Sequence, residues 1–209
     1  MKILKAEHMG HDDWYFHSLL NEANLLQQLA NDVNVVNLFD CGFIYSEEPE
    51  PTDGDIVSFG LEVGAFVRAG DQFLSEGWRP YLALELMPSS NNVPVLIAQG
   101  RRARIPREEA IELSRQFVEL LVRIHEQHIM YRDFKLEHTY WDGNQLVVID
   151  WNASAQISPA AAANERRVEL RKLVTAVIYP IFTLQSPLGD GIYRSQERDP
   201  RENERSLSS

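Results

Sequence analysis

Two aspartates that flank a predicted β-hairpin could carry acid–base or metal chemistry. Asp133 precedes the hairpin and Asp150 follows its second strand, with the turn at 142–144. The turn sequence Asp-Gly-Asn tolerates the left-handed backbone of a tight turn, and the apolar run 145–149 is typical of a buried strand. Because a hairpin folds the chain back, the two carboxylates can face a common cleft. One could then handle a proton while the other holds a divalent cation.

The sequence around both aspartates follows a recognisable pattern. Residues 131–138 read Tyr-Arg-Asp-Phe-Lys-Leu-Glu-His, and residues 149–152 read Ile-Asp-Trp-Asn. The first run resembles the catalytic loop of the protein-kinase-like fold, His-Arg-Asp-x-Lys-x-x-Asn, and the second resembles its Asp-Phe-Gly segment.

This resemblance implies a role for each matched residue. Asp133 would accept the proton of an acceptor hydroxyl or orient it, and Lys135 would steady the γ-phosphate. Asp150 would bind Mg²⁺. His138 stands where the family has an asparagine that binds a second metal ion, and imidazole binds Mg²⁺ less well than an oxygen ligand. Some bacterial lipopolysaccharide sugar kinases also look to have histidine there.

Earlier parts of the chain resemble the same family in the same order. The start, Lys2-Ile-Leu, is similar to the third strand of kinases, whose lysine reaches the nucleotide phosphates. Residues 12–30 are expected to form a helix with a broad apolar face, and Glu22 within it resembles the αC glutamate that holds this lysine. The alternative is a solvated lysine near a free N-terminus and a solvated helix glutamate.

The middle of the first half is predicted to contain strands. Apolar runs at 35–44 and 81–86 favour two of them, and the second resembles the kinase hinge. The resemblance implies that backbone groups of Glu85 to Met87 contact the adenine edge of ATP. Residues 56–74 are expected to form an inserted or extended hairpin with glycines at its bends.

The second half is predicted to be mainly helical. Residues 106–128 have apolar side chains at helical spacing and a proline at the first turn. Residues 153–164 resemble a shortened activation segment, and a helix is expected over 165–184. Glu169 in that helix stands where the family has an aspartate.

Composition limits the partners and the compartment. A formal net charge of −11 disfavours nucleic acid or anionic membrane as a partner. Cys41 is the single cysteine, which fits a reducing compartment. The longest apolar stretch, 173–184, is too short for a bilayer of ~30 Å hydrocarbon. Together with the lack of a signal-peptide pattern, this predicts a cytoplasmic protein.

The predicted fold is α+β, a two-lobed protein-kinase-like fold with a reduced N-lobe and a shortened, mainly helical C-lobe. The N-lobe is expected to lack the strands of a glycine-rich loop, since only Met1 precedes Lys2 in the sequence. The expected parts are an N-lobe over 1–88 with an insert at 45–76, a C-lobe over 89–188 and a disordered polar tail over 189–209.

The expected function is transfer of the γ-phosphoryl group of ATP, with Mg²⁺, to a hydroxyl of a protein or small molecule. One alternative is a pseudokinase that senses nucleotide or binds a partner without catalysis. A second alternative is a plain α+β interaction domain. The sequence leaves the acceptor unknown, and a homodimer or a regulatory protein partner remains open.

Overall fold

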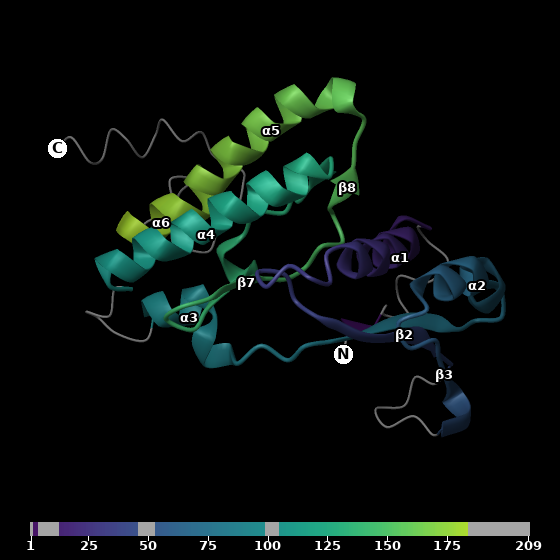
Figure 1. The fold of residues 1–209 in the computed structure, drawn as a ribbon. Helices are drawn as coiled ribbons and strands as arrows, with labels where there is room; N and C mark the ends of the chain where they lie inside the picture. The colour runs from purple at the N-terminus through teal and green to yellow at the C-terminus, as the bar shows by residue number, and fades with distance from the viewer. Residues whose placement is uncertain (1, 4–12, 46–52, 99–104, 184–209) are drawn as a thin grey trace. The chain divides into compact units, whose positions relative to one another are not determined.

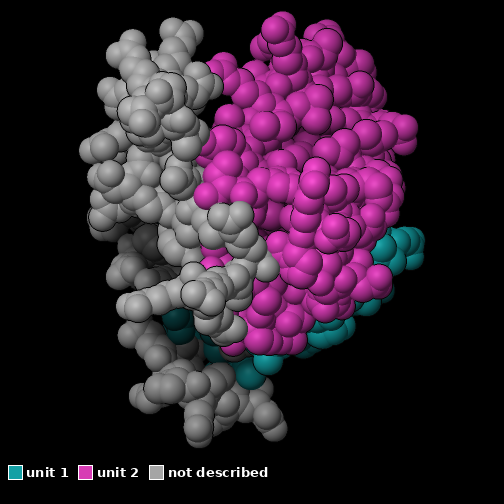
Figure 2. Space-filling view, turned by 90° about the vertical axis from the view of Figure 1, so that its left-hand side faces the viewer, with its two compact units in different colours: residues 1–86, 150–154 teal, residues 87–149, 155–209 magenta. Residues whose placement is uncertain are grey.

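A computed structural model of the chain shows helices together with small antiparallel sheets, consistent with the α+β prediction (Figure 1). It describes residues 2–3, 13–45, 53–98 and 105–183. The chain divides into two compact units, shown in different colours in Figure 2. The first unit contains residues 1–86 and 150–154, and the second contains 87–149 and 155–209.

The first unit contains a four-stranded antiparallel sheet in the order β1-β4-β2-β3. Its strands are β1 (Lys2–Ile3), β2 (Leu38–Ile44), β3 (Ile56–Ser58) and β4 (Arg79–Leu84). The strands predicted at 35–44 and 81–86 are confirmed, with shifted ends. A short 3₁₀ turn at Asp53–Asp55 precedes β3.

Two helices, α1 (Asp13–Gln28) and α2 (Val63–Ser75), cover one face of this sheet (Figure 1). The prediction of a helix over 12–30 is therefore confirmed. Apolar side chains from both helices and from the sheet form the core of the unit. The buried members are Phe16, Leu19, Leu20, Ala23, Cys41, Phe43, Val63, Phe66 and Leu82.

The expectation of a hairpin over 56–74 is wrong, because only β3 is extended and α2 occupies most of the rest. Glycines in this run suggested bends. Gly70 lies instead where α2 packs against α1, and a Cβ there would come within 3.1 Å of Leu20 and Phe16. The missing side chain lets the two helices approach closely. Residues 46–52 of the predicted insert lie outside the described residues.

The second unit is mainly helical, with two short antiparallel strand pairs, β5 with β8 and β6 with β7. Its helices are α3 (Val93–Ala98), α4 (Arg107–Glu126), α5 (Pro159–Leu173) and α6 (Tyr179–Thr183), with 3₁₀ turns at Ser89–Asn91 and Leu136–His138. Its strands are β5 (Ile129–Met130), β6 (Thr139–Trp141), β7 (Leu146–Val148) and β8 (Ala155–Gln156). The predicted helix over 106–128 and the predicted hairpin are both confirmed.

Helix α4 holds the β6–β7 hairpin through side chains as well as apolar packing. The Trp141 indole N–H donates to Glu109 Oε2 at 2.9 Å. The backbone N–H of Leu146 donates to Gln116 Oε1, also at 2.9 Å. Both hairpin strands are thereby attached to the helix that leads into the predicted catalytic loop.

Helix α5 begins at Pro159, which corrects the predicted start at residue 165. Proline suits the first turn of a helix, and the alanines at 160–163 have the highest helix propensity. The helix continues through a π-helical stretch at Val174–Ile178 into α6. Pro180 follows that stretch and, lacking an N–H, cannot complete regular helical bonding there.

None of the described helices has the length and apolar character needed to cross a membrane. The tail predicted to be disordered, 189–209, lies outside the described residues.

Candidate functional site

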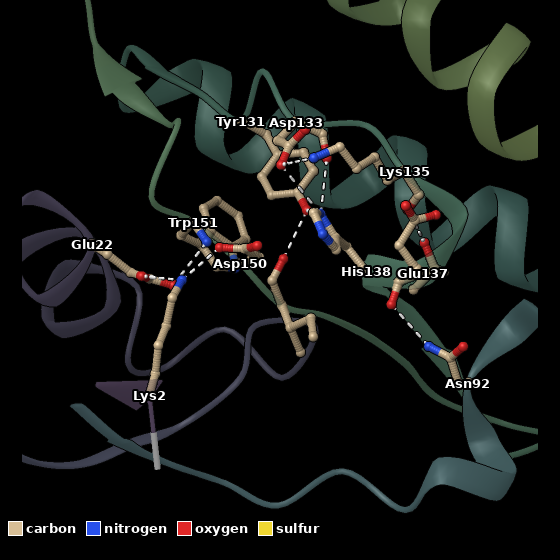
Figure 3. A network of polar contacts seen from close by, with 12 residues as sticks. Lys2, Glu22, Asn92, Tyr131, Asp133, Lys135, Glu137, His138, Asp150 and Trp151 are labelled. Carbon is tan, nitrogen blue, oxygen red and sulfur yellow. Dashed lines mark hydrogen bonds and ion pairs between the residues drawn. The ribbon is translucent and has the colours of Figure 1, made fainter. Parts of the chain in front are cut away.

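One group of charged residues lies in the first unit. The Lys2 Nζ atom lies 2.7 Å from Glu22 Oε2 and 2.6 Å from Asp150 Oδ1 (Figure 3). Strand β1 positions Lys2 through its pairing with β4, and α1 carries Glu22. The Glu22 side chain is 0% exposed, whereas Lys2 keeps 30% and Asp150 27% of side-chain exposure. The group therefore joins a buried anion to two charges that solvent reaches.

Segment 150–154 is attached to α1 by further hydrogen bonds. The Trp151 backbone N–H donates to Glu22 Oε1 at 3.0 Å, and Asn21 Nδ2 donates to the Ser154 carbonyl at 2.7 Å. Asp150 itself adopts a left-handed backbone with φ of 61°. Sequence reasoning missed Asn21, since no local pattern indicates a hydrogen bond to a residue so far along the chain.

Burial and charge act in opposite directions on this group. Burial lowers the pKa of Lys2, but the charges of Glu22 and Asp150 outweigh it, so the Lys2 pKa lies above its ordinary value. Burial raises the pKa of Glu22, and the nearby Lys2 ammonium and the Trp151 N–H offset this only in part. Lys2 is therefore cationic at neutral pH, and the charged form of Glu22 depends on it.

A second group lies in the second unit, around the loop that follows β5. Lys135 Nζ pairs with Asp133 Oδ2 at 2.9 Å (Figure 3). His138 Nδ1 lies 3.3 Å from the Asp133 carbonyl oxygen and 3.5 Å from Asp133 Oδ2. The Asp133 side chain is 14% exposed. The Asp133 carboxylate thus lies close to the Lys135 ammonium and the His138 imidazole and remains in contact with solvent.

Tyr131 connects this loop to the strand before Asp150. Its hydroxyl donates to the Ile149 carbonyl at 2.7 Å, and its ring packs edge-on against Phe134. The side chain is 1% exposed. Tyrosine therefore packs beneath the loop at the position where the kinase motif has histidine.

A buried pair supports the same loop from two helices. Glu169 of α5 accepts a hydrogen bond from the Arg132 backbone N–H at 2.5 Å, and its other oxygen lies 2.7 Å from His125 Nε2. Glu169 and His125 are 2% and 7% exposed. Arg132 has φ of 68°, a conformation that a long L side chain rarely adopts. Sequence reasoning did not anticipate the part of His125, which is visible only once α4 and α5 pack together.

The predicted hinge residues follow the end of β4. The Glu85 N–H donates to the Asn37 carbonyl at 2.9 Å, and Asn37 Nδ2 donates to Glu85 Oε2 at 2.7 Å. Met87 is half-buried and begins the second unit. Among the described contacts, Glu85 and Met87 join neither charged group.

The structure thus brings Lys2, Glu22 and Asp150 together in one unit, and Asp133, Lys135 and His138 together in the other. No protein family model matches this chain, and no curated protein is similar to it. The chemistry of these two groups is therefore the basis for assigning a function.

Proposed function

We propose that this chain is a kinase-like protein of two reduced lobes that binds ATP with Mg²⁺ and transfers its γ-phosphoryl group to a hydroxyl. The observation that carries the proposal is the contact of one lysine with two carboxylates that lie 20 and 148 positions away in the chain. A cation held by a buried glutamate beside a more exposed aspartate suits a site that receives phosphates and a metal ion.

The residues of each group would act on different parts of the substrate. Lys2 would bind the α- and β-phosphates while Glu22 keeps it in position. Asp133 would orient the acceptor hydroxyl and accept its proton, and Lys135 would neutralise charge on the γ-phosphoryl group. The backbone of Glu85 to Met87 would contact the adenine edge.

Asp150 would bind the cation, because a carboxylate offers the oxygen ligands that Mg²⁺ prefers. Asp133 and His138, which lie together in the other unit, are the further residues that could contribute ligands. His138 Nδ1 faces the Asp133 carbonyl, which leaves the carboxylates as the stronger ligands. When bound, the cation would neutralise charge on the β- and γ-phosphates.

The second candidate is a pseudokinase that binds nucleotide, or a partner protein, without turnover. Two observations favour it. His138 takes the place of an oxygen ligand, and Lys2 already contacts the Asp150 carboxylate. Both features would weaken cation binding without preventing a nucleotide from binding.

Two measurements test the proposal. Mg-ATP should raise the unfolding temperature, with an increase that grows with the logarithm of its concentration. Turnover of γ-labelled ATP should fall by about 10²–10⁴ in Asp133→Asn, because a positioned base contributes that much to rate. Asp71→Asn, an exposed carboxylate on α2, is the matched control and should leave turnover unchanged.

The outcomes separate the candidates. Binding of Mg-ATP without turnover that depends on Asp133 would select the pseudokinase. Absence of any thermal shift at millimolar Mg-ATP would reject both nucleotide-binding candidates and favour a plain α+β interaction domain.

A further inference from the structure

The Lys2 ammonium is paired with Asp150, the carboxylate that would bind a divalent cation in the proposed function. Its Nζ atom lies 2.6 Å from Asp150 Oδ1, slightly closer than its 2.7 Å contact with Glu22. Asp150 keeps 27% of its side-chain exposure, so an ion from solvent could reach it. In this arrangement a divalent cation at Asp150 meets a positive charge already in place.

We propose that Lys2 and a divalent cation compete for Asp150, so that the cation binds weakly until a nucleotide draws Lys2 away. This inference rests on the proposed function. Triphosphate oxygens would give Lys2 an alternative anionic partner, and Asp150 would then be released to the metal ion. Lys2 would in this way couple binding of the nucleotide to binding of the cation.

Glu22 allows Lys2 to leave Asp150 with only a small movement. Its buried carboxylate is fixed by the Trp151 N–H through one oxygen and contacts Lys2 through the other. Lys2 can therefore leave Asp150 by moving its ammonium group while Glu22 still holds it.

Since coupling between two bound ligands is reciprocal, the nucleotide should tighten cation binding by the same factor as the cation tightens nucleotide binding.

The first test measures Mn²⁺ binding to the full chain without nucleotide, by titration with electron paramagnetic resonance detection. An opposite charge at contact distance changes the proton affinity of a carboxylate by about ten-fold or more. We therefore expect Lys2→Met to bind Mn²⁺ about ten-fold more tightly than the wild type. Lys172→Met removes an exposed lysine of α5 and should bind Mn²⁺ as the wild type does. Asp150→Asn should lose the site.

Three results would overturn the inference. They are equal Mn²⁺ affinity in Lys2→Met and wild type, binding that persists in Asp150→Asn, and no binding to Lys2→Met at all. None of these measurements uses ATP. The inference can therefore fail while Asp133-dependent turnover is observed, and it can hold in a protein that never turns over ATP.

A second test needs no variant, which matters if Lys2→Met folds poorly. In the wild type, saturating Mn²⁺ should displace the Lys2 ammonium from Asp150 and speed its acetylation by an activated ester, as followed by mass spectrometry. Lys172 in the same sample is the internal control, and its rate should not change. A Lys2 rate that does not respond to saturating Mn²⁺ would contradict the competition.

Discussion

Removing Lys2 should destabilise the first unit more than removal of a lysine elsewhere. Lys2→Met keeps most of the side-chain stem but leaves the Glu22 carboxylate, which is 0% exposed, without its cation. Breaking a fully buried ion pair costs about 3–5 kcal/mol. Because Lys2 keeps 30% of its side-chain exposure, we expect a smaller loss, about 2 kcal/mol in the free energy of unfolding.

The loss should depend on pH in a direction that identifies Glu22 as its source. The pKa of Glu22 is already raised in the folded protein, and removal of Lys2 raises it further. The folded state then keeps a proton at a pH where the unfolded carboxyl, with a pKa of about 4.3, has released it. The stability loss in Lys2→Met is therefore largest above the folded-state pKa of Glu22. It shrinks as the pH falls toward the pKa of the unfolded Glu22 carboxyl.

Urea unfolding followed by far-UV circular dichroism, at neutral and at mildly acidic pH, measures both effects. Lys172→Met is the matched control and should change stability by less than about 0.5 kcal/mol. The double variant Lys2→Met with Glu22→Gln should recover part of the loss and lose its pH dependence. A deficit in Lys2→Met that equals the control, or that stays constant with pH, would refute the reasoning.

Two further predictions concern positions with matched variants. Gly42→Ala would place a Cβ 2.2 Å from the Val57 carbonyl oxygen, so we expect a loss of about 2 kcal/mol or more in the free energy of unfolding, measured by the same urea titration. A Cβ at Gly54 meets nothing within 4 Å, so Gly54→Ala should be close to neutral in that titration. Glu169→Ala removes the acceptor of the Arg132 N–H and should cost about 1–3 kcal/mol. Glu169→Gln keeps an acceptor oxygen and should cost less. Equal losses in the two variants would show that the Glu169 acceptor does not stabilise the Arg132 N–H.

Periodicity was sufficient to predict the long helices and the hairpin. Helices α1 and α4 carry apolar side chains at helical spacing over several turns, so the local pattern and the tertiary packing favour the same structure. The Asp142-Gly143-Asn144 turn indicated the hairpin between β6 and β7 in the same local way. These elements contain or border Glu22, Asp133 and Asp150, which is why most candidate residues could be named in advance.

Helix α2 was missed because Gly70 has a role in tertiary packing. Gly70 reads as a bend in isolation, whereas its role is to admit Leu20 and Phe16 of another helix. The start of α5 was misplaced for a different reason. Its resemblance to an activation segment outweighed the local preference of a proline followed by alanines. In both places the local pattern was compatible with a helix, but another interpretation of the residues was preferred.

The backbone near the two candidate aspartates contains non-glycine residues in the left-handed region. The described non-glycine residues with positive φ are His128, Arg132 and Asp150. Histidine and aspartate tolerate this conformation comparatively well, so Arg132 is the informative position. A non-glycine residue held in a left-handed conformation costs of order 1–3 kcal/mol and persists only where surrounding contacts impose it.

Those contacts come from distant parts of the chain. Glu169 accepts the Arg132 N–H from α5, immediately before Asp133. Asp150 is contacted by Lys2, 148 positions earlier. The two positions differ in kind: at Arg132 a buried acceptor holds the backbone N–H, whereas at Asp150 the contact is to the side chain. Since aspartate tolerates a left-handed backbone, the Glu169 contact at Arg132 is the one that must offset backbone strain, and it fixes the chain directly before Asp133.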